Sequence, residues 1–168
     1  MSKETIKPRF QYDRNLENTK NEWLTPPEII KLLGQFDLDP CAPVEDKRPW
    51  PTANRHYDIS QDGLKMPWFG RVWCNPPYET KLAAAFLEKC LNHGNAIALI
   101  FARTETANWF NYIWGKADCV LFVKGRLTFY HSSGNKAVCS AGAPSALIAY
   151  GKKNAEVLLK SNLGYCVS

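Results

Sequence analysis

The 168-residue sequence lacks several features that define whole classes of protein. It has no apolar run of the roughly 18–20 residues that a membrane-spanning helix needs. Its opening residues, MSKETIKPRF, contain no apolar core that would indicate a secretory signal. Internal repeats and low-complexity segments are absent too. We therefore expect a soluble, intracellular protein with one folded domain.

Clustered metal ligands are also missing. None of the six cysteines forms a C-x-x-C pair, and the three histidines are scattered along the chain. A zinc site needs ligands at close spacing, so we expect no bound metal. Most of the cysteines lie in apolar stretches, which indicates free thiols packed like small hydrophobic side chains in a reducing compartment.

The charge balance is moderately basic. Lys and Arg number 21 against 16 Asp and Glu, which gives a net charge of +5. Hydrophobic residues make up 45% and charged residues 22%, close to the average of globular domains. The excess positive charge favours a polyanionic partner such as nucleic acid without establishing one.

The first half of the chain has few regular elements. Residues 1–20 are polar and charge-rich, and we expect a flexible N-terminal arm there, followed by a single domain over 21–168. Thr25 precedes a predicted helix that opens with Pro26-Pro27-Glu28 and ends at Gly34, so we expect Thr25 to cap it. A short strand over 36–39 follows, and then the proline-containing, polar residues 43–67 predict a long irregular excursion.

The second half alternates strands and helices. We predict strands over 71–74, 96–101, 118–123, 125–130 and 145–150, and helices over 80–92 and 106–115. This order predicts an α/β fold with a mainly parallel sheet, helices on both faces and an antiparallel edge.

The sharpest chemical signal is the turn Asn75-Pro76-Pro77-Tyr78, directly after the predicted strand over 71–74. Ligands of such sheets bind beyond the carboxyl ends of the strands. Two prolines remove two N–H donors and hold both φ angles near −65°. The turn therefore presents a side-chain amide, bare carbonyl oxygens and an aromatic ring, although the same string is also acceptable as a plain strand-ending turn.

Such a turn suits a planar amino group with two N–H bonds, such as the exocyclic amine of adenine. That amine is a poor nucleophile because its lone pair is delocalised into the ring. If the Asn75 side-chain oxygen and the Pro76 carbonyl accepted both hydrogens, the lone pair would localise on nitrogen. Tyr78 would hold the base by stacking, a contribution of roughly 1–3 kcal/mol.

Six segments together resemble one family. In chain order they are EWLTPPEII, FDLDPCAP, QDGL, VWCNPPY, VKGRLTF and APSALIAY, and they span residues 22–150. The series resembles the phage-type, Dam-like DNA N6-adenine methyltransferases, which use S-adenosylmethionine. The resemblance implies a Rossmann-like methyltransferase sheet, double-stranded DNA as the partner, and action in the cytoplasm of a phage-infected or lysogenic bacterial host.

The resemblance also implies residue roles. Thr25 and Pro26 would lie at the methionine carboxylate of the cofactor, and Asp39, with Pro40 and Cys41, at its α-amino group. Asp62 would bind the adenine amino group of the cofactor, and Asp58 is a candidate for its ribose hydroxyls. The catalytic motif would be Asn75, Pro76, Pro77 and Tyr78.

The chain departs from related methyltransferases in one respect. A glycine-rich turn usually follows the first strand, but here no glycine occurs between Gly34 and Gly63. The cofactor would therefore approach this turn differently. There is also no room for a separate target-recognition domain, so sequence readout would come from 43–61, 130–144 and the N-terminal arm.

Methylation of a duplex requires the adenine to be flipped out, at a cost of a few kcal/mol. Basic side chains that contact phosphates would offset that cost. Phe129 would supply a second stacking face, although the sequence fits an ordinary core position in a strand at least as well. The candidates for DNA contacts are Lys47, Arg48, Arg55, Arg103, Lys124, Arg126, Phe129 and Lys136.

Two other functions stay open at the level of sequence. One is a methyltransferase that acts on RNA bases or on protein glutamine. The other is a non-catalytic nucleic-acid-binding module with a degenerate cofactor site. Cytosine-N4 methyltransferases usually carry a serine-led motif, so Asn75 favours adenine.

Overall fold

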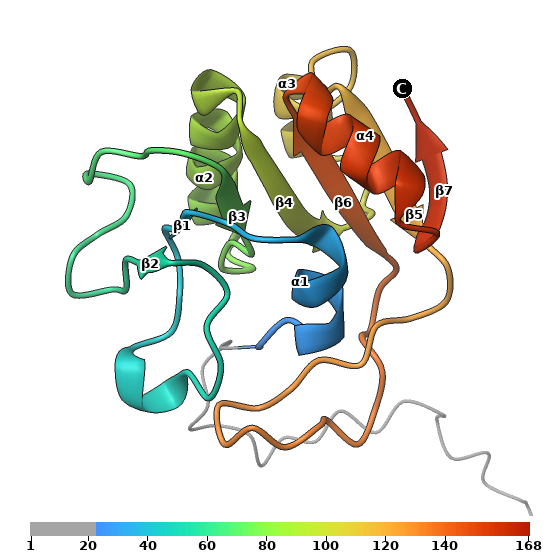
Figure 1. The fold of residues 1–168 in the computed structure, drawn as a ribbon. Helices are drawn as coiled ribbons and strands as arrows, with labels where there is room; N and C mark the ends of the chain where they lie inside the picture. The colour runs from blue at the N-terminus through green and yellow to red at the C-terminus, as the bar shows by residue number, and fades with distance from the viewer. Residues whose placement is uncertain (1–22) are drawn as a thin grey trace, which may run out of the picture.

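The computed structural model describes residues 23–168 (Figure 1). The predicted N-terminal arm lies outside the described residues and stays a prediction. The helices are α1 (Pro27–Leu33), α2 (Thr80–His93), α3 (Ala107–Tyr112) and α4 (Lys152–Lys160), with a short 3-10 helix, η1 (Glu45–Lys47). In the part of the chain that the structure describes, none of the helices has the length and apolarity needed to cross a lipid bilayer.

The strands form one sheet of seven. They are β1 (Leu38–Asp39), β2 (Arg55–His56), β3 (Val72–Cys74), β4 (Ala96–Phe101), β5 (Cys119–Val123), β6 (Ser145–Tyr150) and β7 (Gly164–Val167). Their order is β2-β1-β3-β4-β6-β5-β7. The pairs among β2, β1, β3 and β4 are parallel, whereas β6 runs antiparallel to β4 and β5, and β7 runs antiparallel to β5.

The predicted α/β class is confirmed, but a mainly parallel sheet is not. Antiparallel pairing joins all the strands beyond β4. The physical reason lies in the connection from β5 to β6, which contains no helix. Without a crossover helix the chain returns antiparallel to the strand that it has just left.

The boundaries of β4 and β6 agree with the predicted strands, whereas the predicted strand over 125–130 is wrong. Only Tyr130 of that segment makes isolated bridges, to Leu24 and Lys136. The chain leaves the sheet at Gly125, whose φ of 77° an extended strand does not allow. Three further elements were not expected from the sequence: β2 and β7, which are short strands at the two edges of the sheet, and the nine-residue helix α4.

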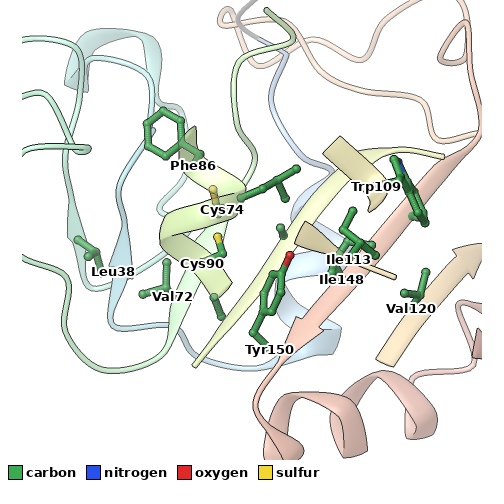
Figure 2. Close-up of a cluster of buried hydrophobic side chains, with 14 of the residues drawn as sticks. Leu38, Val72, Cys74, Phe86, Cys90, Trp109, Ile113, Val120, Ile148 and Tyr150 are labelled. Carbon is green, nitrogen blue, oxygen red and sulfur yellow. The ribbon is translucent and has the colours of Figure 1, made fainter. Parts of the chain in front are cut away.

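Helices cover both faces of the sheet. The face with α2 and α3 carries a buried cluster that includes Val72, Cys74, Phe86 and Trp109 (Figure 2). The other face packs Trp73 and its neighbours against α1 and α4. The alternation of Val72, Trp73 and Cys74 between the faces follows from the two-residue period of a strand. All six cysteines are free thiols.

The parallel half of the sheet decides where a site can form. Since β1, β2, β3 and β4 point the same way, their carboxyl ends meet at one edge. Asp39 ends β1, Asn75 follows β3, and Phe101 ends β4. Segments from distant parts of the sequence therefore converge there.

A close backbone contact compensates for the missing glycine-rich turn after β1. Gly63 is buried, and a Cβ atom placed on it would lie 1.8 Å from the carbonyl oxygen of Pro40. The QDGL segment therefore packs directly on the turn that follows Asp39. The glycine that the first turn lacks is supplied by a segment more than twenty residues later in the chain.

This contact predicts a large effect of Gly63→Ala. The added methyl group meets backbone rather than a movable side chain, so we expect a loss of about 3 kcal/mol of stability. Thermal denaturation should show a Tm lower by roughly 6–12 °C. Gly142→Ala is the matched control, because a Cβ there meets nothing within 4 Å. Equal Tm values for the two variants would contradict the contact.

Candidate active site

A cavity of about 450 Å³ lies at the carboxyl edge of β1 and β3, within the size range of small-ligand sites. Every residue that the sequence assigned to catalysis or cofactor binding lines it, except Pro26. These residues are Thr25, Asp39, Pro40, Cys41, Asp58, Asp62, Asn75, Pro76, Pro77 and Tyr78. Tertiary structure thus gathers segments that are separated by more than fifty residues.

The Asn75 side chain has a defined orientation. Its Nδ2 donates to the carbonyl oxygen of Trp23 at 3.0 Å and to Oγ1 of Thr25 at 3.4 Å. Both partners are acceptors for the amide nitrogen, so the side-chain oxygen points the other way. Within residues 23–168 no side chain or backbone group donates to that oxygen, which leaves it as an acceptor at the cavity.

Thr25 has a different local role from the predicted one. The residue that caps α1 is Pro26, and no side chain caps this helix. The expectation that Thr25 caps the helix is therefore wrong; Thr25 is buried and its hydroxyl faces Asn75. Pro26 and Pro27 have no N–H groups, so the start of α1 offers few donors for an anion.

The Tyr78 ring stacks on Phe101, with ring centroids 4.6 Å apart and planes 7° from parallel. Phe101 covers one face of the Tyr78 ring, and Tyr78 also lines the cavity. Burial raises the pKa of the Tyr78 phenol, which therefore stays neutral. Tyr78 is suited to stacking rather than to proton transfer.

Asp39 is the most perturbed carboxyl group of the cavity. It is 3% exposed, and burial raises its pKa from 3.8 to about 6. The Thr52 hydroxyl donates to Oδ2, and the backbone N–H of Cys41 donates to Oδ1 at 3.1 Å. The nearby positive charge of Arg48 partly offsets the effect of burial on the pKa. A buried carboxylate of this kind suits a cationic ligand group.

Asp58 and Asp62 flank a turn beside the cavity. Asp58 comes two residues after β2, which runs parallel to β1, so an acidic residue does follow a second strand here. Its Oδ1 accepts hydrogen bonds from the N–H and the hydroxyl of Ser60. Asp62 has a φ of 55° and forms an ion pair with Lys65 at 3.0 Å.

Two tryptophans that sequence reasoning missed, Trp23 and Trp50, also line the cavity. The Trp50 ring meets Tyr130 edge-on at 5.1 Å, and the Trp23 ring lies 5.0 Å from the His131 ring. The two excursions proposed for sequence readout, 43–61 and 130–144, therefore meet beside the cavity. Only the presence of a large aromatic residue in a polar, proline-containing segment could have indicated Trp50 from sequence.

Of the basic residues predicted to contact DNA, only Arg48 lines the cavity. Its charge acts on both Asp39 and Asp58. Arg103 is exposed, with its guanidinium 5.8 Å from the centre of the Phe101 ring. The other basic candidates are exposed and do not line the cavity: Lys47, Arg55, Lys124, Arg126 and Lys136.

Phe129 is not available as a second stacking face. It is 5% exposed and belongs to the core on the α1 side of the sheet. The sequence around Phe129 is compatible with either a buried or an exposed ring. Only the packing of the folded chain distinguishes these two positions. Across residues 23–168, no group of three or more potential metal ligands is found.

Comparison with known proteins identifies one relationship. The family model described as Dam, DNA N-6-adenine-methyltransferase, matches residues 13–162. No curated protein and no solved structure matches the chain.

The buried carboxyl group of Asp39 predicts a pH-dependent cost in stability. Because the pKa of Asp39 is higher in the folded state, protonation of its carboxyl group stabilises the folded protein. This contribution is fully present below about pH 4 and is lost as pH rises through about 6. At pH 7 the ionised group then costs about 3 kcal/mol. Asp39→Asn removes this cost and keeps both hydrogen bonds, because the Thr52 hydroxyl can also accept.

We therefore expect the Tm of Asp39→Asn, relative to the natural sequence, to increase between pH 4.5 and pH 7.5 by roughly 4–8 °C, because the cost of ionisation grows by about 2 kcal/mol over this range. Differential scanning calorimetry over this range is the measurement. Asp46→Asn, which makes the same change at an exposed position on η1, is the control. A Tm difference for Asp39→Asn that does not change with pH would refute the assignment.

Proposed function

This chain belongs to the DNA N-6-adenine-methyltransferase (Dam) family, and from that premise we propose that it methylates N6 of adenine in duplex DNA with S-adenosylmethionine as the donor. The observation that carries the proposal is the orientation of Asn75. Its amide nitrogen is held by Trp23 and Thr25, and its oxygen is left as an acceptor at the cavity.

The residues present fit S-adenosylmethionine. The buried Asp39 carboxylate suits the α-ammonium group, and its charge is available above pH 6. Asp58 and Asp62, at the same cavity, suit the ribose hydroxyls and the adenine amino group respectively. When bound, the cofactor supplies an electrophilic methyl group on a sulfonium.

The carboxylate group of the cofactor has fewer evident hydrogen-bond donors in this cavity than its other groups have partners. The family resemblance assigns it to Thr25 and Pro26, yet Thr25 already accepts from Asn75 and the start of α1 is poor in N–H donors. We retain Thr25 as a candidate contact and add Arg48. Its half-buried guanidinium lines the cavity beside Asp39 and supplies the positive charge that the helix start does not.

In the proposed reaction the Asn75 oxygen and the Pro76 carbonyl accept the two N6 hydrogens of the target adenine. This draws the nitrogen lone pair out of the ring and directs it towards the methyl group. No carboxylate is needed as a general base, because the methylated nitrogen is acidic and loses a proton to solvent or to a cavity oxygen afterwards.

The target base would stack on the face of Tyr78 opposite Phe101. Reaching this position requires flipping the base, which costs a few kcal/mol. Phosphate contacts from the exposed basic residues would offset the cost. Arg103 is the candidate nearest to the stacked pair, because its guanidinium lies 5.8 Å from the centre of the Phe101 ring that stacks on Tyr78.

The decisive experiment is methyl transfer from labelled S-adenosylmethionine to unmethylated duplex DNA, followed by digestion to nucleosides. Label in N6-methyladenine is the expected result. If label appears only with RNA or protein acceptors, one of these and not DNA is the substrate. Absence of both label and cofactor binding would leave a nucleic-acid-binding domain in which Asn75-Pro76-Pro77-Tyr78 is a structural turn.

Replacement of Asn75 tests its role directly. Asn75→Ala removes one acceptor of the adenine amine, and we expect turnover to fall on the order of 100-fold or more. The Kd for S-adenosylhomocysteine, measured by calorimetry, should stay within about twofold, since the side chain does not reach the cofactor in this proposal. Asn92→Ala, on the exposed side of α2, is the matched control and should change neither quantity. Turnover that survives the loss of Asn75 would overturn the mechanism.

A further inference from the structure

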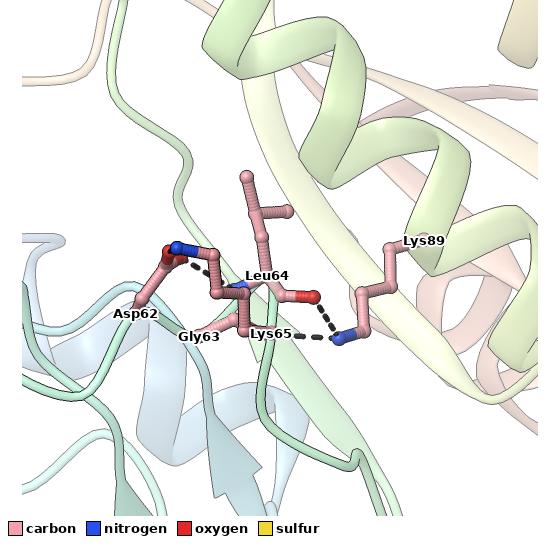
Figure 3. Close-up of polar contacts among 5 residues, drawn as sticks. All are labelled: Asp62, Gly63, Leu64, Lys65 and Lys89. Atoms are coloured by element: carbon pink, nitrogen blue, oxygen red, sulfur yellow. Dashed lines mark hydrogen bonds and ion pairs between the residues drawn. The ribbon is translucent and has the colours of Figure 1, made fainter.

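One lysine, Lys89, hydrogen-bonds to the backbone of the loop that carries Asp62. Lys89 extends from α2, and its Nζ donates to the carbonyl oxygens of Gly63 at 3.2 Å, Leu64 at 2.6 Å and Met66 at 2.7 Å. Figure 3 shows the lysine reaching this loop from the helix. An ammonium group has three N–H donors, and here each has a backbone acceptor.

Lys89 binds the loop through the loop's backbone; the hydrogen bond and charge of Lys65 lower the pKa of Asp62, and the positive charge of Lys89 also lowers it, but less. The ion-pair partner of Asp62 is Lys65. Trp68 supports the same loop, since its Nε1 donates to the Gly63 carbonyl at 2.8 Å. The Lys89 ammonium lies 5.2 Å from the centre of the Trp68 ring, so the two side chains form one support under the loop.

This support connects the separate segments of the cavity. Helix α2 begins at Thr80, directly after the catalytic turn that ends at Tyr78. Lys89 therefore ties the Asp62 loop to the helix that follows the catalytic turn. On its other side the loop packs through Gly63 against the Pro40 carbonyl. Any displacement of the loop would move Asp62 relative to both neighbouring segments.

We propose that Lys89 is a positioning residue for cofactor binding, which holds residues 62–66 so that Asp62 faces the adenine of S-adenosylmethionine. The inference rests on the proposed function of this cavity. Lys89 itself does not line the cavity, so it acts through the loop and not by contact with the ligand.

Lys89→Met removes the three hydrogen bonds and keeps an apolar side chain beside Trp68. We expect the Kd for S-adenosylhomocysteine and for methylthioadenosine to rise by a similar factor, about tenfold, because both ligands contain the adenosine that Asp62 would bind. The turnover number at saturating S-adenosylmethionine should change by less than about threefold, since Asn75 is untouched. Lys89→Arg, which retains N–H donors, should recover much of the affinity.

Lys116→Met is the matched control. Lys116 also donates to two carbonyl oxygens, those of Phe110 at 3.1 Å and Asn111 at 2.6 Å, but it lies at the end of α3 away from the cavity. This variant should lower the Tm and leave both Kd values unchanged. A purely structural role of Lys89 predicts the same behaviour for Lys89→Met, and that result would overturn the proposal.

A measurement without cofactor separates this inference from the proposed function. The amides of Lys65 and Met66 donate to the Asp62 carbonyl, at 2.8 and 3.2 Å. In Lys89→Met they should exchange hydrogen at least about fivefold faster, and in Lys116→Met at the normal rate. Unchanged exchange would refute the support itself. If exchange is faster in Lys89→Met but the natural protein binds no S-adenosylhomocysteine, the support by Lys89 stands and the proposed function is refuted.

Discussion

The hydrogen bond from Asn75 Nδ2 to the Trp23 carbonyl determines what the cavity can do. An asparagine amide has a donor end and an acceptor end, and a rotation by half a turn would exchange them. With the nitrogen held by Trp23 and Thr25, the oxygen is available to a ligand that donates hydrogens. The two prolines that follow have no backbone N–H, so they add carbonyl acceptors and no competing donors to the turn. The proposed chemistry depends on this polarity.

The surrounding structure fixes the relative positions of three short segments: the turn after β1, the turn after β3 and the loop that contains Gly63. The thiol of Cys41 donates to the Asn75 carbonyl at 3.3 Å and lies 3.7 Å from the Cys74 sulfur, so the turns after β1 and β3 are in direct contact. Gly63 packs on Pro40 from the other side, and Lys89 supports the loop that contains Gly63. A glycine-rich turn after β1 is unnecessary in this arrangement, because the close approach of backbone segments that such a turn allows is achieved between two different loops.

The cavity also shows where stability is given up. Asp39 is a buried carboxyl group whose ionised form is disfavoured by its surroundings, as its raised pKa indicates. Its hydrogen bonds from Thr52 and Cys41 only partly compensate. An apolar or amide side chain would be cheaper at this position, which supports a functional reason for the charge. By contrast, the buried Cys74 and Cys90 pack in the apolar core cluster on the α2 side of the sheet.

The sequence by itself determined the elements with strong local signals and the residues of the candidate site. The continuous apolar runs of β4 and β6, the periodic face of α2 and the two prolines after Asn75 each have a local physical cause, and together with the family motifs they sufficed to assign ten of the residues that line the cavity. Tertiary structure decided the rest. The antiparallel half of the sheet depends on which strands pair, the burial of Phe129 on what packs over it, and the role of Thr25 on a partner fifty residues away. Thr52 and Lys89 carried no signal in the sequence, and Trp50 carried only that of a large aromatic residue in a polar segment, because a hydroxyl, a ring or an ammonium acquires its role only from the groups that folding brings within a few ångströms of it.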